Sequence, residues 1–146
     1  MQKERNKNKY TIYSDGGSRG NPGPAGCGIF IVDSNGKPLE KRYKYIGVAT
    51  NNIAEYTAIL LGISRAIELG AASIEVRADS KLAIEQLSGN FKVKNPDLKS
   101  IFDIIGEKIS NWGGEVKFVH IPREKNKEAD RLANVAMDVG ECKRRE

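Results

Sequence analysis

The spacing of apolar residues changes once along this chain, near residue 50, and that change limits the folds open to it. Before it, apolar and aromatic side chains alternate with polar ones, a pattern typical of β-strands. Three such runs occupy residues 9–15, 27–33 and 38–48. Asn35-Gly36 predicts a tight hairpin turn, and the glycine- and proline-rich residues 16–26 predict a loop. This part of the chain is therefore expected to be an antiparallel β-meander.

From Asn52 to Leu69 the apolar residues recur at helical spacing around most of the circumference, which predicts a largely buried helix. The patterns that follow predict strands at 73–78 and 115–121, helices at 80–88, 96–112 and 126–137, and a frayed tail at 140–146. This order predicts an α/β fold with a mixed five-stranded sheet and helices on both faces. Strands 1–3 are antiparallel, and strands 4 and 5 run parallel to strand 1. The carboxyl ends of strands 1 and 4 then lie side by side, at the edge where such sheets place ligands.

The chain is predicted to form one domain over residues 9–139, between a basic tail at 1–8 and a C-terminal tail at 140–146. No apolar run approaches the roughly 20 residues of a membrane span and no signal peptide is evident, so we expect a cytoplasmic monomer without membrane contact. Cys27 and Cys142 lack the spacing of metal ligands and are interpreted as free thiols, with a disulfide between them left open. The net charge of +5 favours an anionic partner, unless the basic residues at the two ends are merely solvated.

Four acidic residues lie where predicted strands end or helices begin: Asp15, Glu55, Asp79 and Asp130. Taken singly, Asp15 could form a turn, Asp79 could belong to a helix cap with Ser80, and Asp130 could be a surface charge. Glu55 is harder to explain, because it is a charge on a helix with little polar surface. The predicted fold brings all four toward one edge of the sheet, and gathered carboxylates usually surround cations. Oxygen ligands suit Mg²⁺ or Mn²⁺, so an acidic site in a basic protein predicts metal-assisted attack on a phosphodiester.

The segments around these acids resemble the four motifs of type 1 ribonuclease H. They read YSDGGSRGNPGPAG (13–26), TNNIAEYTA (50–58), RADS (77–80) and NKEADRLAN (126–134). The likeness runs from about residue 9 to residue 138, with the motifs in order. It implies the ribonuclease H-like fold and endonucleolytic hydrolysis of the RNA strand of an RNA–DNA hybrid, with two Mg²⁺ or Mn²⁺ ions and products carrying 5′-phosphate and 3′-hydroxyl ends. It also implies that the four acids are the metal ligands.

The resemblance further implies residues that bind the substrate. These are Gly16, Gly17, Asn21, Asn51, Asn52 and Ser80. Glycines allow the backbone to approach a ligand closely, and contacts to 2′-hydroxyls let a protein distinguish RNA from DNA. Helix capping is the alternative role of Asn51 and Asn52, and the two roles are compatible. Ser80 is also a plausible N-cap.

The chain departs from the family pattern at two places. Many relatives carry a histidine in the loop before the fourth acid, but residues 121–126 contain none, and His120 is interpreted as a strand residue. We expect Arg123 to act in that loop by holding a phosphate. Residues 89–99 lack the tryptophan-containing basic insertion of some relatives, so weaker and salt-dependent hybrid binding is expected. Two alternatives stay open: a binding module for hybrid or duplex RNA without turnover, and a related metal nuclease that acts on another substrate, such as duplex RNA or DNA junctions.

Overall fold

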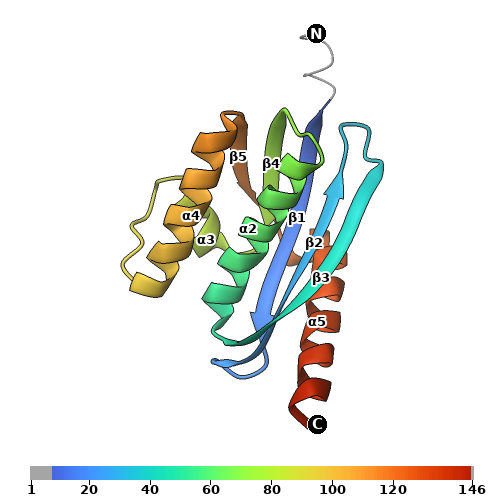
Figure 1. The fold of residues 1–146 in the computed structure, drawn as a ribbon, viewed down its shortest axis with the longest axis vertical. Helices are drawn as coiled ribbons and strands as arrows, with labels where there is room; N and C mark the ends of the chain where they lie inside the picture. The colour runs from blue at the N-terminus through green and yellow to red at the C-terminus, as the bar shows by residue number, and fades with distance from the viewer. Residues whose placement is uncertain (1–7, 146) are drawn as a thin grey trace.

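A five-stranded sheet in the order β3-β2-β1-β4-β5 runs through the computed structural model, which describes residues 8–145 (Figure 1). The strands are β1 (Lys9–Ser18), β2 (Gly23–Val32), β3 (Pro38–Ala49), β4 (Ser73–Ala78) and β5 (Glu115–His120). β1 to β3 form the antiparallel meander. β4 pairs in parallel with β1, and β5 pairs in parallel with β4. The predicted fold class and strand directions are confirmed.

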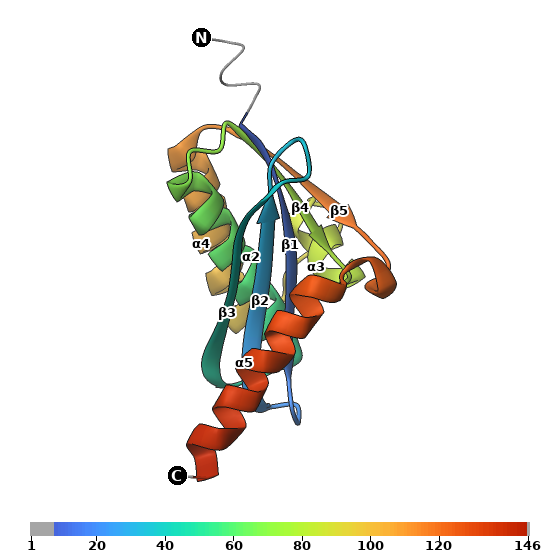
Figure 2. The ribbon, with the colours of Figure 1, turned by 90° about the vertical axis from the view of Figure 1, so that its right-hand side faces the viewer.

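Helices cover both faces of this sheet. They are α2 (Asn51–Glu68), α3 (Lys81–Leu87), α4 (Pro96–Trp112) and α5 (Lys127–Arg145), with a short 3₁₀ turn, η1 (Arg123–Lys125). In Figure 2, α2 and α4 lie on one side of the sheet and α5 lies on the other. The main core forms under α2, where Ile12 of β1, Ile31 of β2 and Ile63 of α2 are fully buried. Within residues 8–145, no helix is long and apolar enough to cross a membrane.

Two glycines of the meander determine how closely the helices approach the sheet. A Cβ at Gly16 would lie 2.2 Å from the carbonyl oxygen of Ala54 in α2, and one at Gly28 would lie 2.3 Å from the carbonyl oxygen of Ala129 in α5. Both neighbours are backbone atoms, which cannot rotate away as a side chain can. Only glycine fits at these positions, so the sequence places α2 and α5 against β1 and β2 at short range.

The structure differs from the prediction in the length of three elements, β1, β2 and α5. Residues 16–18 and 23–26 were expected in a loop, but they extend β1 and β2. Residues 16–18 pair with 25–27, residues 23–24 pair with β3, and residues 19–22 form the connection. The last helix does not end at Met137 and no frayed tail begins at residue 140, because α5 continues to Arg145. Of the predicted basic tail at 1–8, only Asn8 is among the described residues.

Gly140 explains why the end of α5 was predicted too early. Glycine near the end of an apolar pattern usually signals a helix C-terminus. Here a Cβ at Gly140 would lie 2.1 Å from the ring of Tyr45, so this glycine lets β3 approach α5. The residue was required by packing rather than by a helix cap.

Candidate active site

Asp15 and Asp79 are neighbours because of the parallel register of β1 and β4. Ser14 and Ala78 are the last registered pair of these two strands, and the two aspartates follow them directly. Both line a small recess together with Glu55 and Ser80. The recess lies at the carboxyl end of β4, the edge at which the sequence predicted a site.

Glu55 enters this recess from the second turn of α2. That helix begins with Thr50, whose hydroxyl accepts a hydrogen bond from the backbone N–H of Ile53. The N-cap of α2 is therefore Thr50 and not Asn51 or Asn52. Burial raises the pKa of Glu55, Asp79 adds to the rise, and a hydrogen bond with Ser80 opposes it. Ser80 is also the N-cap of α3 as predicted, because its hydroxyl accepts from the N–H of Ala83 at 3.2 Å.

Asp130 reaches the cluster from the first turn of α5. Its carboxyl group is within hydrogen-bonding reach of the Asp15 carboxyl. Arg123, on η1, lies on the solvent side of Asp130, with its Nη2 3.6 Å from Asp130 Oδ1 and a side chain that is 80% exposed. The four predicted acids therefore converge, and the guanidinium of Arg123 stands beside one of them.

The electrostatics of the cluster are those of a site for cations. Burial first, and then the charges of Asp79, Asp130 and Glu55, raise the pKa of Asp15 to about 8. Like charges at such a position are unfavourable unless a positive charge compensates them. A set of oxygen donors alone fits hard divalent ions such as Mg²⁺ or Mn²⁺. Among residues 8–145, no three Asp, Glu, His or Cys side chains stand close enough to enclose a metal ion as they lie.

Asn126 is a residue of the site that was not among the predicted site residues, although it begins both the last predicted helix and the fourth motif. Its side-chain NH₂ donates to the carbonyl oxygen of Ser14 at 2.8 Å and to Asp79 Oδ2 at 3.1 Å. The side chain is 1% exposed. The only signal in the sequence is its place four residues before Asp130, and that spacing equally suits a helix cap.

The turn between β1 and β2 is held from both sides. Toward α2, Asn21 Oδ1 accepts a hydrogen bond from the backbone N–H of Asn51, and Asn51 Oδ1 accepts from the N–H of Ser18 at 2.8 Å. Toward α5, the guanidinium of Arg19 forms ion pairs with Asp138 and Glu141. The predicted substrate-binding residues Asn21 and Asn51 are thus in contact with each other, and Asn52 is exposed beside them.

Gly16 and Gly17 lie in a different setting from the one expected. They were expected in a loop that presents its backbone to RNA, but Gly16 pairs with Cys27 and Gly17 with Gly26 in the sheet. Gly16 is also packed tightly against α2. β4 ends at Ala78, opposite Ser14. Beyond Ser14, the side of β1 that faces away from β2 therefore has no strand beside it among the described residues.

His120 is the last residue of β5, as its interpretation as a strand residue required. Its ring Nε2 lies 3.3 Å from the backbone carbonyl oxygen of Asp79, and its side chain is exposed. His120 therefore lies near the site, on the side of Asp79 that faces away from β1.

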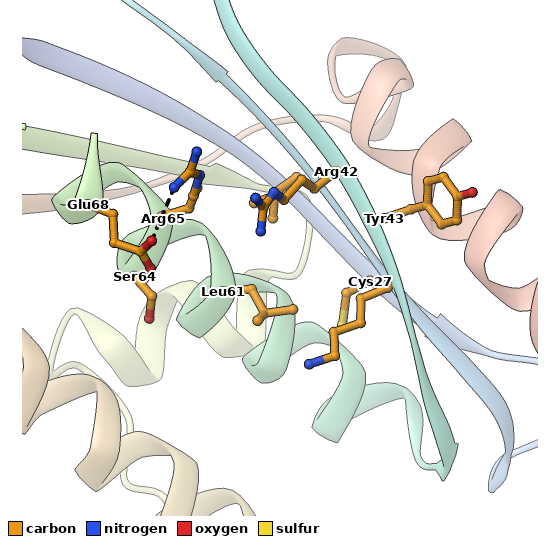
Figure 3. A pocket seen from close by; sticks show the side chains of 9 residues that line it. Cys27, Arg42, Tyr43, Leu61, Ser64, Arg65 and Glu68 are labelled. Atoms are coloured by element: carbon orange, nitrogen blue, oxygen red, sulfur yellow. Dashed lines mark hydrogen bonds and ion pairs between the residues drawn. The ribbon is translucent and has the colours of Figure 1, made fainter. Parts of the chain in front are cut away.

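A larger pocket of about 200 Å³ lies elsewhere, between β3 and α2 (Figure 3). Arg42, Lys44 and Arg65 line it, together with Cys27. Glu40 pairs with both arginines, and Glu68 pairs with Arg65, so most of this positive charge is balanced locally. None of the four converging acids lines this pocket, and we do not assign it to the active site.

Fold and site together define a class: α/β proteins that gather carboxylates beside the carboxyl ends of two adjacent parallel strands. The sequence pattern described as "Reverse transcriptase-like" matches residues 13–136. "Ribonuclease H" of Ruthia magnifica is 34% identical over 146 residues, which cover 90% of this chain and 97% of that protein. The chain belongs to the ribonuclease H family.

Two further relatives are more similar in sequence. "Bifunctional protein Rv2228c" of Mycobacterium tuberculosis is 44% identical over 131 residues, but this chain spans only 36% of its length. The solved N-terminal RNase H domain of that protein aligns with a TM-score of 0.88 at 43% identity, covering 92% of this chain and 97% of the solved one. LC11-RNase H1, solved in complex with an RNA/DNA hybrid, aligns with a TM-score of 0.85 at 44% identity, covering 88% of this chain and 96% of the solved one.

Proposed function

We propose that this chain is an endoribonuclease that hydrolyses the RNA strand of RNA–DNA hybrids with two divalent metal ions, Mg²⁺ or Mn²⁺. The observation that carries the proposal is the convergence of Asp15, Glu55, Asp79 and Asp130 from four separate elements. The membership in the ribonuclease H family supports it, as does a relative at 44% identity that was solved with such a hybrid. The products carry 5′-phosphate and 3′-hydroxyl ends.

The four carboxylates are the proposed metal ligands, and the other three all raise the pKa of Asp15. Two divalent ions held by these side chains would lower the pKa of an attacking water and stabilise the leaving 3′-oxygen. The attacking water gives up a proton to solvent as its oxygen bonds to phosphorus, the P–O3′ bond breaks with its electron pair going to O3′, and the 3′-oxygen takes up a proton from solvent. The chain's own contribution is to gather these oxygen donors at one edge of the sheet before substrate arrives.

Recognition of the RNA strand is assigned to the turn between β1 and β2 and to the start of α2. Asn21 and Asn51 fix each other through a hydrogen bond, and Asn52 is exposed next to them. We propose that these amides, with backbone groups of Gly16 and Gly17 and the hydroxyl of Ser80, contact the hybrid, the amides reading 2′-hydroxyls. Such contacts select by shape and sugar, with little preference for sequence.

The test is cleavage of a 5′-labelled RNA strand annealed to DNA, with Mg²⁺ or Mn²⁺, by wild type and Asp79→Asn. Asp103→Asn, on the exposed side of α4, is the matched control. We expect internal RNA cuts that require metal, fall by about 1,000-fold or more in Asp79→Asn, and persist in Asp103→Asn. Wild type that binds the hybrid but never cuts it would leave a hybrid-binding module as the better description.

The same assay with RNA–RNA and DNA–DNA duplexes defines the substrate class. We expect cleavage of the hybrid to exceed that of duplex RNA, and no cleavage of DNA, because DNA lacks the 2′-hydroxyls. Equal rates on hybrid and duplex RNA would overturn the assignment of the hybrid as the preferred substrate.

Arg123 is proposed to hold the scissile or leaving phosphate, since a guanidinium binds phosphate oxygens well. Its position beside Asp130 and its exposure support that role. Arg123→Ala is expected to lower kcat about tenfold or more, whereas Arg131→Ala, which loses an ion pair with Glu128 on the same helix, should leave kcat nearly unchanged. Unchanged turnover in Arg123→Ala with loss of turnover in His120→Ala would transfer the role to His120.

A further inference from the structure

Asn126 forms hydrogen bonds at or next to three of the four acids. Its NH₂ group donates to Ser14, which precedes Asp15, and to the carboxylate of Asp79. Its backbone carbonyl oxygen accepts the N–H of Asp130 at 3.1 Å. One residue thus joins β1, Asp79 at the end of β4 and the start of α5, the first two through its side chain and the third through its backbone, and it does so from a fully buried position.

The orientation of this amide is fixed by its neighbours. A carbonyl oxygen and a carboxylate oxygen can only accept hydrogen bonds, so the NH₂ and not the Oδ1 must face them. The opposite atom, Asn126 Oδ1, is buried and has no hydrogen-bond partner among the described residues. A buried acceptor without a partner is unfavourable, because it has given up its hydrogen bonds to water.

A helix cap does not explain the presence of asparagine here. A capping side chain accepts a backbone N–H of the first turn through its oxygen, as Asn95 does for the N–H groups of Asp97 and Leu98 in α4. Asn126 precedes α5 in the same way, yet its oxygen makes no such bond. What the residue supplies is its two donor hydrogens, and both go to β1 and Asp79.

We propose that Asn126 is a positioning residue of the proposed nuclease. It holds one oxygen of Asp79, so that the other is free to face the carboxylate cluster, and it docks the start of α5 on β1, so that Asp130 stays beside Asp15. Loss of its donors allows Asp79 and Asp130 to separate, and the site then binds divalent ions less tightly and turns over more slowly. This inference rests on the proposed function for its kinetic part only, because metal binding is measurable without substrate.

The experiment compares Asn126→Ala with Asn95→Ala, the same change at a true helix cap. For each we would measure the thermal midpoint, the dissociation constant of Mg²⁺ by calorimetry without nucleic acid, and kcat and KM on a labelled hybrid. Both variants should be destabilised. Only Asn126→Ala should weaken Mg²⁺ binding several-fold and lower kcat by about tenfold or more, with KM changed less than kcat. Asn126→Ser, which keeps one donor, should lie between it and wild type.

Folded Asn126→Ala with the Mg²⁺ affinity and kcat of Asn95→Ala would overturn the proposal. If neither variant at Asn126 folds, the side-chain NH₂ resonances of Asn126 in wild type decide: they should be protected from exchange and shift when Mg²⁺ is added, while those of Asn95 should not. Resonances that exchange freely and ignore the metal would refute the role. Wild type without hybrid cleavage would instead count against the proposed function, and the calorimetric comparison would still decide the role of Asn126.

Discussion

Asp15 is an acid whose pKa is raised strongly by burial and by its acidic neighbours. Burial and three neighbouring carboxylates all raise its pKa, to about 8 from an ordinary value of 3.8. In the folded, metal-free protein Asp15 therefore binds a proton that the unfolded chain has already lost. The free energy of unfolding must fall as pH rises from about 4 to about 8, because the folded state alone holds that proton in this window.

Asp15→Asn should remove this loss of stability. In EDTA at pH 8 we expect the variant to be more stable than wild type by at least about 1 kcal/mol, and near pH 4 the difference should shrink. Urea denaturation at several pH values measures it. Asp103→Asn serves as the control, since it changes an exposed i,i+4 pair and should shift stability by no more than about 0.5 kcal/mol at any pH. A wild type whose stability rises from pH 4 to pH 8 as much as that of Asp15→Asn would contradict the prediction.

At the residue scale, the sequence indicated the four acidic residues of the site but not Asn126, which is neutral. The acids could be found because charge at the end of an apolar strand, or on an apolar helix, is unusual by itself. Asn126 gave no such sign, since asparagine before a helix is ordinary, and its role depends on which acceptors the tertiary fold sets opposite its amide. The second contact of Ser80, with Glu55, was missed for the same reason.

Among the elements, α5 carries Asp130 and depends on Gly28 for its distance from the sheet. Gly28→Ala places a methyl group against backbone atoms of Ala129 and Ala133, so α5 must move outward. We expect a loss of at least about 2 kcal/mol in the free energy of unfolding, and a lower kcat in the protein that remains folded. Thermal or urea denaturation and the cleavage assay measure the two effects.

Gly106→Ala is the matched control for that substitution. Gly106 lies inside α4, and a Cβ added there would have open space around it, so alanine should stabilise the helix by roughly 0.5–1 kcal/mol. We therefore expect Gly28→Ala to lower the free energy of unfolding and Gly106→Ala to raise it. Gly28→Ala with wild-type stability would mean that α5 does not pack against β2 at this distance.

The elements themselves were predictable where local pattern and tertiary packing agree. The alternation of β1, β4 and β5 and the apolar surface of α2 gave their positions to within a few residues. The prediction was wrong where a glycine lets two elements pack closely. Gly16, Gly26 and Gly140 were interpreted as loop or tail residues, but each lies in a strand or helix that packs against a neighbouring element. The ion pairs of Arg19 with Asp138 and Glu141 could not be foreseen, because both acids lie beyond Met137, where the predicted helix ended.

Over the whole molecule, an acidic site sits in a protein with a net charge of +5. Attraction to the phosphates of a hybrid comes from this excess of lysine and arginine, whereas turnover depends on the carboxylates. Salt screens this attraction and reduces the gain from counterion release, so it should act on binding more than on chemistry. For two or three phosphate contacts, raising monovalent salt from about 50 to 200 mM should raise KM on the order of tenfold, with kcat nearly constant.

Steady-state cleavage at several salt concentrations and constant Mg²⁺ measures this dependence. A variant that lacks residues 1–7 separates the charges of that segment from those of the domain: an unchanged slope of log KM against log salt assigns phosphate binding to residues 8–145, and a shallower slope assigns part of it to the removed lysines and arginine. A KM that is independent of salt in both proteins would mean that neutral contacts, such as those expected of Asn21, Asn51 and Asn52, account for nearly all of the affinity. In that case the positive charge of the chain would have no part in holding the hybrid.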